Sequence, residues 1–240
     1  MEREISGVPG AKLFGGEGIR KSFGRKAVLE GADLRLPVGG IVGIFGLNGA
    51  GKTTLLRILA GLDSDFSGSL YKADFEDVGY MAPDENFPPD MTVRGAVDFF
   101  DRFGKGADGE AIFSALREAN IREKQLLLSM SLGMRQYFRF LLTVHCATSV
   151  CLFDEPFTNL DVNLRARVAD TMIRECGDDR LFLVTTHEIK EIETLIDGFF
   201  VLKGGRLSEY YPSEDVRERT GKSVEEFYRD AVNGAGPKGF

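Results

Sequence analysis

The stretch "GLNGAGKT" (46–53) could bind a phosphate group, because it fits the pattern G-x-x-x-x-G-K-[ST]. The apolar run "IVGIF" (41–45) precedes it, and the helical pattern "KTTLLRILAGL" (52–62) follows it. Glycines between a strand and a helix let backbone N–H groups surround an anion, and the helix N-terminus adds partial positive charge. We expect Lys52 to reach the outer phosphates of a nucleotide and the Thr53 hydroxyl to reach Mg²⁺.

Two adjacent carboxylates supply the second part of a possible nucleotide site. The segment "SVCLFDEP" (149–156) places Asp154 and Glu155 directly after an apolar run. One carboxylate at such a strand end can hold the metal, which we expect of Asp154, and Glu155 could polarise an attacking water. His187 ends "LFLVTTH" (181–187), so it should lie beside the same phosphates at the carboxyl edge of the sheet.

The elements that must position these residues are buried strands interleaved with helices. This pattern predicts an α/β protein with a mainly parallel sheet. From Thr92 to His145 the pattern is helical, which predicts an inserted helical subdomain over about residues 85–145. The expected strands cover residues 41–45, 78–81, 150–153, 181–185 and 199–202.

The tail after Pro212 is predicted to contain one short amphipathic helix. In "SVEEFYRDAV" (223–232), Ser223 and Glu226 form a capping-box pair. Val224, Phe227, Tyr228 and Ala231 then share one face of the helix. That face should dock either on the chain itself or on a partner.

The composition limits the class of protein. Of 240 residues 43% are hydrophobic, and 30 basic against 37 acidic residues give a net charge of −7, which argues against a nucleic-acid surface. Cys146 and Cys151 lack zinc-site spacing and have no second pair, and we expect these two and Cys176 to be buried or inert reduced thiols. His145 is expected to be structural. We find no window typical of a signal peptide or a membrane span, and we expect a soluble protein.

The order of the motifs "GLNGAGKTT", "SLGMRQ", "LFDEP", "NLD" and "TTH" resembles that of the ATP-binding-cassette (ABC) ATPases. The resemblance covers roughly residues 13–207. It implies a P-loop NTPase core with a mainly parallel sheet, an N-terminal antiparallel β region and an inserted helical subdomain. An ABC ATPase domain would span residues 8–212, followed by the tail 213–240. The resemblance also implies an ATP-hydrolysing subunit of a transporter, with ATP and Mg²⁺ as its cofactors.

In that family a serine-glycine turn opens a helix and binds the γ-phosphate that a second subunit holds. Ser131 and the N–H groups around Gly133 would form this turn, so two chains arranged head to tail would enclose two ATP molecules. Asp161 matches the loop that crosses the dimer, and Phe23 matches the ring that stacks on adenine. Glu155, His187 and Lys52 match the catalytic positions, with His187 as the switch histidine. The phosphate-loop matches are Asn48, Gly49, Ala50, Gly51, Lys52, Thr53 and Thr54; the metal-side matches are Thr53 and Asp154.

The sequence departs from the family pattern in the signature and at one metal-contacting position. The usual signature L-S-G-G-Q here reads "MSLGM" (130–134). Leu132 and Met134 resemble variants of the ABC-2-type exporter ATPases, which implies export. Pro83 stands where the family places a glutamine that touches Mg²⁺, and proline offers no side-chain ligand. Asp84, one residue further, is the candidate substitute. The helical subdomain is also short, and "TNLD" replaces the usual serine-glycine pair before Leu160.

The resemblance implies two partners, namely a second ABC subunit, identical or related, and a transmembrane permease. The chain would then sit in the cytoplasm on the inner face of the cell membrane. The alternative is a nucleotide-gated interaction protein with weak hydrolysis, which Pro83 favours. Translation-factor relatives carry two cassettes in one chain, and chromosome-maintenance relatives carry long coiled coils; we find neither feature in this sequence. A small-molecule kinase or GTPase would share the phosphate loop but would not explain "SLGMRQ" shortly before "LFDEP". The transported substrate stays open.

Overall fold

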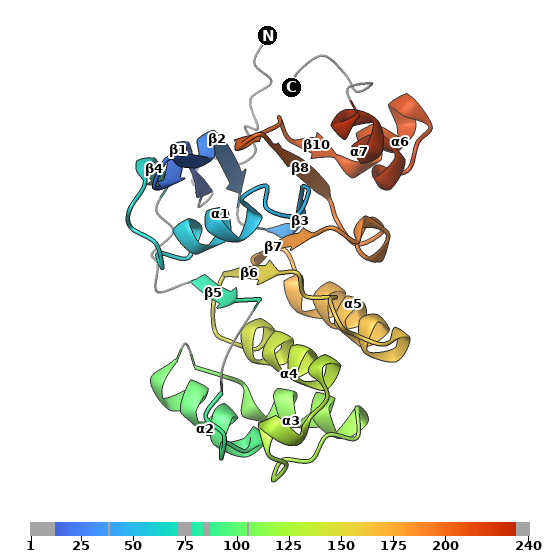
Figure 1. The fold of residues 1–240 in the computed structure, drawn as a ribbon. Coiled ribbons are helices and arrows are strands. Elements are labelled where there is room, and N and C mark those ends of the chain that lie inside the picture. Colours follow the sequence, from blue (N-terminus) through green and yellow to red (C-terminus); the bar gives the residue numbers. More distant parts are fainter. Residues whose placement is uncertain (1–12, 38, 72–77, 84–86, 105, 234–240) are drawn as a thin grey trace.

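The chain forms two sheets that are arranged around helix α1 (Figure 1). The computed structural model describes residues 13–37, 39–71, 78–83, 87–104 and 106–233. A three-stranded antiparallel sheet has the order β2–β1–β4, and a seven-stranded sheet has the order β10–β8–β3–β7–β6–β5 with β9 beside β8. The strands are β1 (Leu13–Phe23), β2 (Lys26–Pro37), β3 (Gly40–Phe45), β4 (Ser67–Tyr71), β5 (Val78–Met81), β6 (Val150–Asp154), β7 (Leu181–Thr186), β8 (Gly198–Lys203), β9 (Arg206–Leu207) and β10 (Tyr211–Pro212).

The larger sheet is parallel from β5 through β8, as the sequence predicts. The helices that accompany it are α1 (Lys52–Leu59), α2 (Val93–Phe103), α3 (Gly109–Glu118), α4 (Leu132–Val144), α5 (Val162–Cys176), α6 (Ser213–Thr220) and α7 (Val224–Val232). Two short 3-10 turns, η2 (Leu127–Ser129) and η3 (Ile189–Glu191), complete the regular elements among the described residues. The chain therefore has the mixed α/β architecture and the antiparallel N-terminal strands that we expected.

Both faces of the parallel sheet are buried, which explains why its strands read as continuous apolar runs. Along β7, Leu181 and Leu183 belong to the core shared with α1 and the antiparallel sheet. Phe182 and Val184 point the other way, into the core formed with α4 and α5. The strands β3 and β6 alternate in the same manner, so a one-residue slip of any of them would exchange the two cores.

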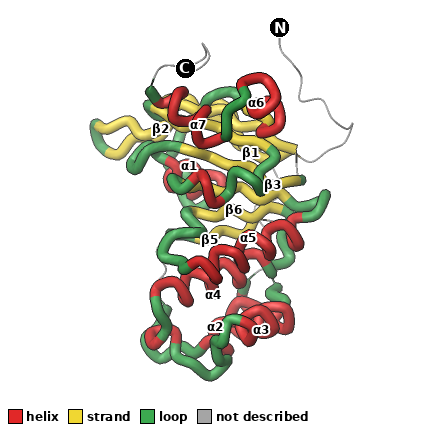
Figure 2. Tube along the Cα trace, turned by 90° about the vertical axis from the view of Figure 1, so that its right-hand side faces the viewer, coloured by secondary structure: helices red, strands yellow, loops and turns green. Residues whose placement is uncertain are grey.

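Helices α2, α3 and α4 lie together at the end of the molecule away from the antiparallel sheet (Figure 2). Thr92 and Asp108 cap α2 and α3 through their side chains. Helix α4 contacts α3, α5 and the strands β5 and β6. It buries nearly all of its residues after the first turn, and it therefore links the helical part of the chain to the parallel sheet.

The tail contains two helices, whereas the sequence analysis predicted one. Helix α6 was missed because "SEDVRERT" is largely charged and buries only Ser213 and Val216, so it has no apolar stripe. Ser223 caps helix α7: its Oγ accepts from the Glu226 N–H at 3.2 Å, while the Ser223 N–H donates to Glu226 Oε2 at 2.9 Å.

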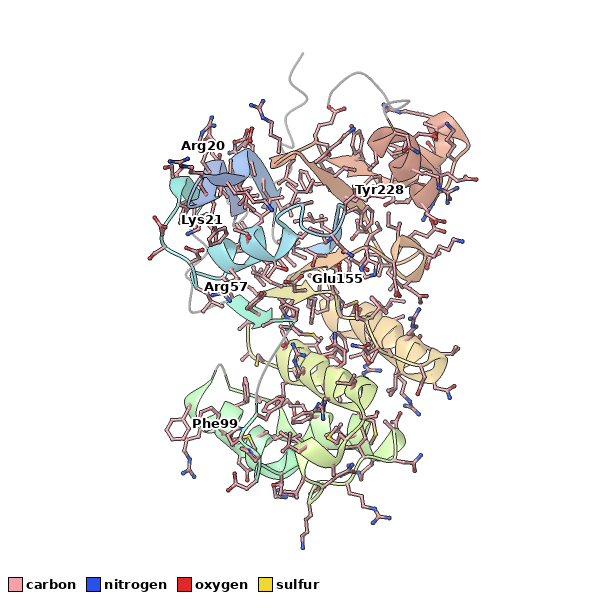
Figure 3. The ribbon with its side chains drawn as sticks, viewed as in Figure 1. Arg20, Lys21, Arg57, Phe99, Glu155 and Tyr228 are labelled. Carbon is pink, nitrogen blue, oxygen red and sulfur yellow. The ribbon has the colours of Figure 1, made fainter. Side chains whose placement is uncertain are left out.

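Helix α7 docks on its own chain. The Phe227 ring lies 5.0 Å from that of Tyr211 and 5.9 Å from that of Phe199, between ring centres. The Tyr228 ring meets the edge of Phe45 at 6.0 Å, and Figure 3 shows Tyr228 turned toward the sheet. Of the two alternatives for this apolar face, the structure therefore shows the intramolecular one.

The three cysteines are buried and unbridged, as expected. Burial raises the pKa of the Cys176 thiol to about 11, which keeps this thiol protonated near neutral pH. His145 is also buried, in the last turn region after α4. Among the described helices, none combines the length and apolar character that a membrane crossing requires.

Replacing Ser223 with alanine should lower the free energy of unfolding by about 1 kcal/mol, because one N–H group of α7 loses its acceptor. Urea unfolding followed by circular dichroism measures this change. Ser64→Ala, at an exposed position, serves as the control and should leave the midpoint in place. Equal midpoints for both variants would show that the capping box does not stabilise the fold.

Candidate active site

Parallel strands far apart in the sequence end at one edge of the larger sheet. Phe45 of β3 lies opposite Thr186 of β7, and Asp154 of β6 lies opposite Thr185. Strand β3 continues into residues 46–53, β6 into Glu155 and β7 into His187. The carboxyl ends of the strands thus bring the three predicted groups together, as such edges do in open α/β sheets.

The loop between β3 and α1 surrounds a pocket of about 320 Å³. Gly49 and Gly51 adopt φ of +77° and +109°, and a Cβ at Gly51 would lie 3.0 Å from Val28 Cγ1. The Lys52 side chain is buried and its Nζ donates to the Gly46 carbonyl at 2.8 Å. The residues that line the pocket are Val28, Asn48, Gly49, Gly51, Lys52, Thr53, Thr54 and Glu155. Ala50 supports the loop through a 3.1 Å hydrogen bond to the Leu47 carbonyl.

Glu155 lies between a cation and an imidazole. Its Oε1 is 3.5 Å from Lys52 Nζ, and its Oε2 is 2.9 Å from His187 Nδ1. The backbone N–H of His187 also donates to Oε2, at 3.3 Å. Glu155 therefore lines the phosphate pocket with both oxygens oriented by neighbours, and Figure 3 shows it at the junction between the sheet and the helices below.

Asp154 is fully buried and has one oxygen satisfied by the protein. Its Oδ1 accepts from Thr185 Oγ1 at 2.7 Å, whereas Oδ2 has no hydrogen-bond partner among the described residues. Burial raises the pKa of nearby Tyr80, and the negative charge of Asp154 raises it further. A buried carboxylate oxygen without a protein donor suits a hard cation. Asp154 is therefore chemically suited to Mg²⁺, and Thr53, which lines the pocket, would offer a hydroxyl as a second oxygen ligand.

Ser131 and Asp161 line a different pocket, of about 640 Å³. Each caps a helix: Ser131 Oγ accepts from the Met134 N–H at 3.2 Å, and Asp161 Oδ1 accepts from the Leu164 N–H at 2.9 Å. Gly133 packs so tightly that a Cβ there would lie 2.5 Å from the Asn159 carbonyl oxygen. Within one chain, therefore, neither the Ser131 turn nor Asp161 lines the pocket of Lys52.

Phe23 ends β1 and is 56% exposed. It is not among the residues that line the phosphate pocket, although Val28 on the neighbouring strand is. The Lys21 ammonium lies 5.1 Å from the centre of the Phe23 ring. Lys21 is itself anchored by Asp63, at 2.8 Å, and by Asp65, at 3.2 Å. The anchored Lys21 ammonium therefore lies over one face of the Phe23 ring.

The sequence analysis missed Thr185, Gln136 and Arg139. Gln136 Nε2 donates to the Glu155 carbonyl at 2.8 Å, and Arg139 donates to the Pro83 carbonyl at 3.0 Å. The sequence does contain a signal for Gln136 and Arg139, because they are two polar residues three positions apart in the otherwise apolar part of α4. Asp84, the suggested substitute for the family glutamine, lies outside the described residues.

The chain is similar to ATP-binding proteins of ABC transporters. The family described as ABC transporter matches residues 29–158. An uncharacterized ABC transporter ATP-binding protein of Methanocaldococcus jannaschii is 31% identical over 208 residues, which cover 83% of this chain and 78% of the relative. The chain belongs to the ABC transporter family. It is an ATP-binding subunit of that family, as the order of its motifs implied.

Other relatives of this ABC subunit are named for opposite directions of transport. A Nod factor export ATP-binding protein I of Ralstonia nicotianae is 29% identical, over 93% of this chain and 75% of the relative. An aliphatic sulfonates import ATP-binding protein SsuB 1 of Pseudomonas savastanoi is 30% identical, over 80% of this chain and 82% of the relative. Similarity to these proteins therefore does not separate export from import.

Solved structures show that the ABC subunit has the fold of this family. The ATP-binding subunit of an ABC transporter aligns with a TM-score of 0.76 at 22% identity, over 92% of this chain and 99% of that chain. A bacterial Atm1-family ABC exporter with ATP bound aligns with a TM-score of 0.75 at 22% identity, over 93% of this chain and 43% of that chain. The expected P-loop NTPase fold is thereby confirmed.

Replacing Thr185 with valine should lower the free energy of unfolding by about 1–3 kcal/mol, because the buried Asp154 carboxylate loses the hydroxyl that donates to its Oδ1. Chemical unfolding at neutral pH measures the change. Thr185→Ser keeps the hydroxyl and should recover most of the loss. A serine variant as unstable as the valine variant would assign the effect to packing instead.

Proposed function

We propose that this ABC subunit hydrolyses ATP and that ATP-driven closure of a dimer powers a transporter. The observation that carries this proposal is the position of Glu155, with one carboxylate oxygen 3.5 Å from Lys52 Nζ and the other 2.9 Å from His187 Nδ1. A carboxylate so oriented beside a phosphate loop can position and polarise a water for attack on the terminal phosphate.

The residues of the pocket divide the work of phosphoryl transfer. The loop N–H groups and Lys52 bind the phosphates, Glu155 orients the attacking water, and His187 holds the Glu155 carboxylate. Asp154 and Thr53 would hold Mg²⁺, which when bound neutralises charge on the phosphates. Phosphoryl transfer to water relies on positioning and on charge rather than on a covalent step. The strand ends fix the groups that provide both.

The dimer is inferred from the separation of the two half-sites. Ser131 caps α4 with an exposed side chain, and it shares a pocket with Asp161 rather than with Lys52. A helix N-terminus attracts anions. In a head-to-tail pair the Ser131 turn of one chain would meet the γ-phosphate held by Lys52 of the other, with Asp161 at the crossing. Loss of that phosphate on hydrolysis would then favour the open dimer.

The partners follow from the transporter role. A transmembrane permease would carry the substrate, and the subunit would lie on the cytoplasmic face of the membrane beside it. Export is favoured by Leu132 and Met134 in the signature. The relatives described above include both an export and an import protein, so the proposed direction rests on those two residues.

A second function is favoured by one position. Pro83 offers no side-chain ligand, which favours a nucleotide-gated interaction protein that binds ATP and hydrolyses it slowly. A steady-state ATPase assay with Mg²⁺, repeated with the co-purified permease, separates the two functions. Turnover confined to background in both preparations, together with ATP binding, would support the gated protein and reject the ATPase.

Glu155→Gln should bind ATP, lower the turnover by at least about 100-fold and accumulate an ATP-bound dimer, because the amide cannot polarise water. Steady-state phosphate release and light scattering measure the two effects. Glu110→Gln, on an exposed part of α3, is the control. Hydrolysis by Glu155→Gln at the rate of the unchanged protein would exclude Glu155 as the catalytic carboxylate.

Ser131→Asp tests the dimer without removing the helix cap. Aspartate caps a helix as well as serine does, but its charge would oppose the γ-phosphate of the partner. We expect ATP binding to a single chain to persist and ATP-dependent dimerisation to weaken by about 100-fold or more. Ser223→Asp makes the same change at the cap of α7 and should dimerise normally. Normal dimerisation of Ser131→Asp would contradict the head-to-tail arrangement.

A further inference from the structure

Helix α4 carries two polar side chains into the core of the molecule. Gln136 is 6% exposed and Arg139 is 8% exposed, although aromatic and aliphatic residues surround them along the helix. Buried polar side chains are costly unless they are hydrogen-bonded, and such networks fix one arrangement of the groups that they join.

The two side chains join three separate segments of the chain. Gln136 Nε2 donates to the Glu155 carbonyl at 2.8 Å. Arg139 donates through one nitrogen to Gln136 Oε1 at 3.2 Å and to the Pro83 carbonyl at 3.0 Å. The helix that begins at Ser131 is therefore bonded to the segment after β6 and to the segment after β5.

The backbone of Glu155 needs such support. Its φ of +54° lies in the left-handed region, which a residue with a side chain keeps only where the surroundings hold it. The Glu155 N–H donates to the Thr185 carbonyl at 3.0 Å, and its carbonyl accepts from Gln136. A rotation at this residue would move the carboxylate relative to Lys52 and His187.

We propose that Gln136 is a positioning residue for Glu155 and that Arg139 couples this position to the segment at Pro83. The inference rests on the proposed ATPase function. The Arg139 contact is made to a backbone carbonyl, so it does not need a side-chain ligand at position 83, which proline lacks. The position of α4, and hence of Ser131, is thereby linked to the geometry of the carboxylate.

The first test replaces Gln136 with leucine, which removes the amide and keeps a similar volume. We expect turnover to fall about 10- to 100-fold, as displaced catalytic groups do, with ATP affinity changed by less than about threefold because the phosphate loop is untouched. Gln136→Glu keeps an acceptor for Arg139 but loses the donor to the Glu155 carbonyl, and its turnover should fall by a factor in the same range. Gln125→Leu, at the other glutamine of the chain, is the control.

A second measurement does not depend on turnover. Amide hydrogen exchange should accelerate in the peptide that contains residues 154–160 of Gln136→Leu, while the peptide that contains residues 46–56 keeps its protection. Arg139→Met should accelerate exchange in the peptide that contains Pro83 and lower turnover less than Gln136→Leu does. Arg102→Met, on an exposed part of α2, is the matched control.

The outcomes separate this inference from the function on which it rests. If the unchanged protein hydrolyses ATP and Gln136→Leu matches it in turnover and exchange, the positioning role is wrong and the ATPase stands. If the unchanged protein does not hydrolyse ATP, the proposed function fails, and faster exchange at residues 154–160 still supports the contact of Gln136. Equal losses of turnover and ATP affinity would indicate a folding defect and would also overturn the positioning role.

Discussion

The peptide of Glu155 is held at both ends, by the Thr185 carbonyl on one side and by the Gln136 amide on the other. This restraint depends on the pairing of β6 with β7, because Asp154 and Thr185 are opposite each other in the register. It also depends on the packing of α4 against strands β5 and β6 of the sheet. If Glu155 is the catalytic carboxylate that we propose, it must stay within a fraction of an ångström of its working position. The packing of both cores would then serve the placement of this one residue.

A consequence of the fold is that two groups of residues proposed to contact the nucleotide line separate pockets of each chain. The Lys52 side chain is buried beside the first pocket, whereas the Ser131 turn and Asp161 cap helices that border the second. In the proposed head-to-tail dimer, the pocket of Lys52 in one chain and the Ser131 turn of the other would face the same nucleotide.

The sequence predicted the parts of the site that follow strand ends, because an apolar run, a turn and a charged residue are local signals. Lys52, Asp154, Glu155 and His187 come together as that reasoning expected. Gln136 and Arg139 were missed because their bonds reach residues 19 and 56 positions away in the chain. Helix α6 was missed for a different reason. Its sequence is largely charged and buries only Ser213 and Val216, so it shows no apolar stripe. The role of Phe23 stays a prediction from resemblance, because its ring does not line the pocket.

Helix α7 contacts the strand that leads into the phosphate loop. Its Tyr228 ring packs against Phe45, the last residue before that loop. Lys203 reinforces the contact through hydrogen bonds to the Ala231 and Val232 carbonyls. Phe45 is the last residue of β3 and Gly46 follows it directly, so a displacement of α7 would reach the start of the phosphate loop through this one side chain. The contacts of α7 thus tie the last described helix of the chain to the base of the phosphate loop.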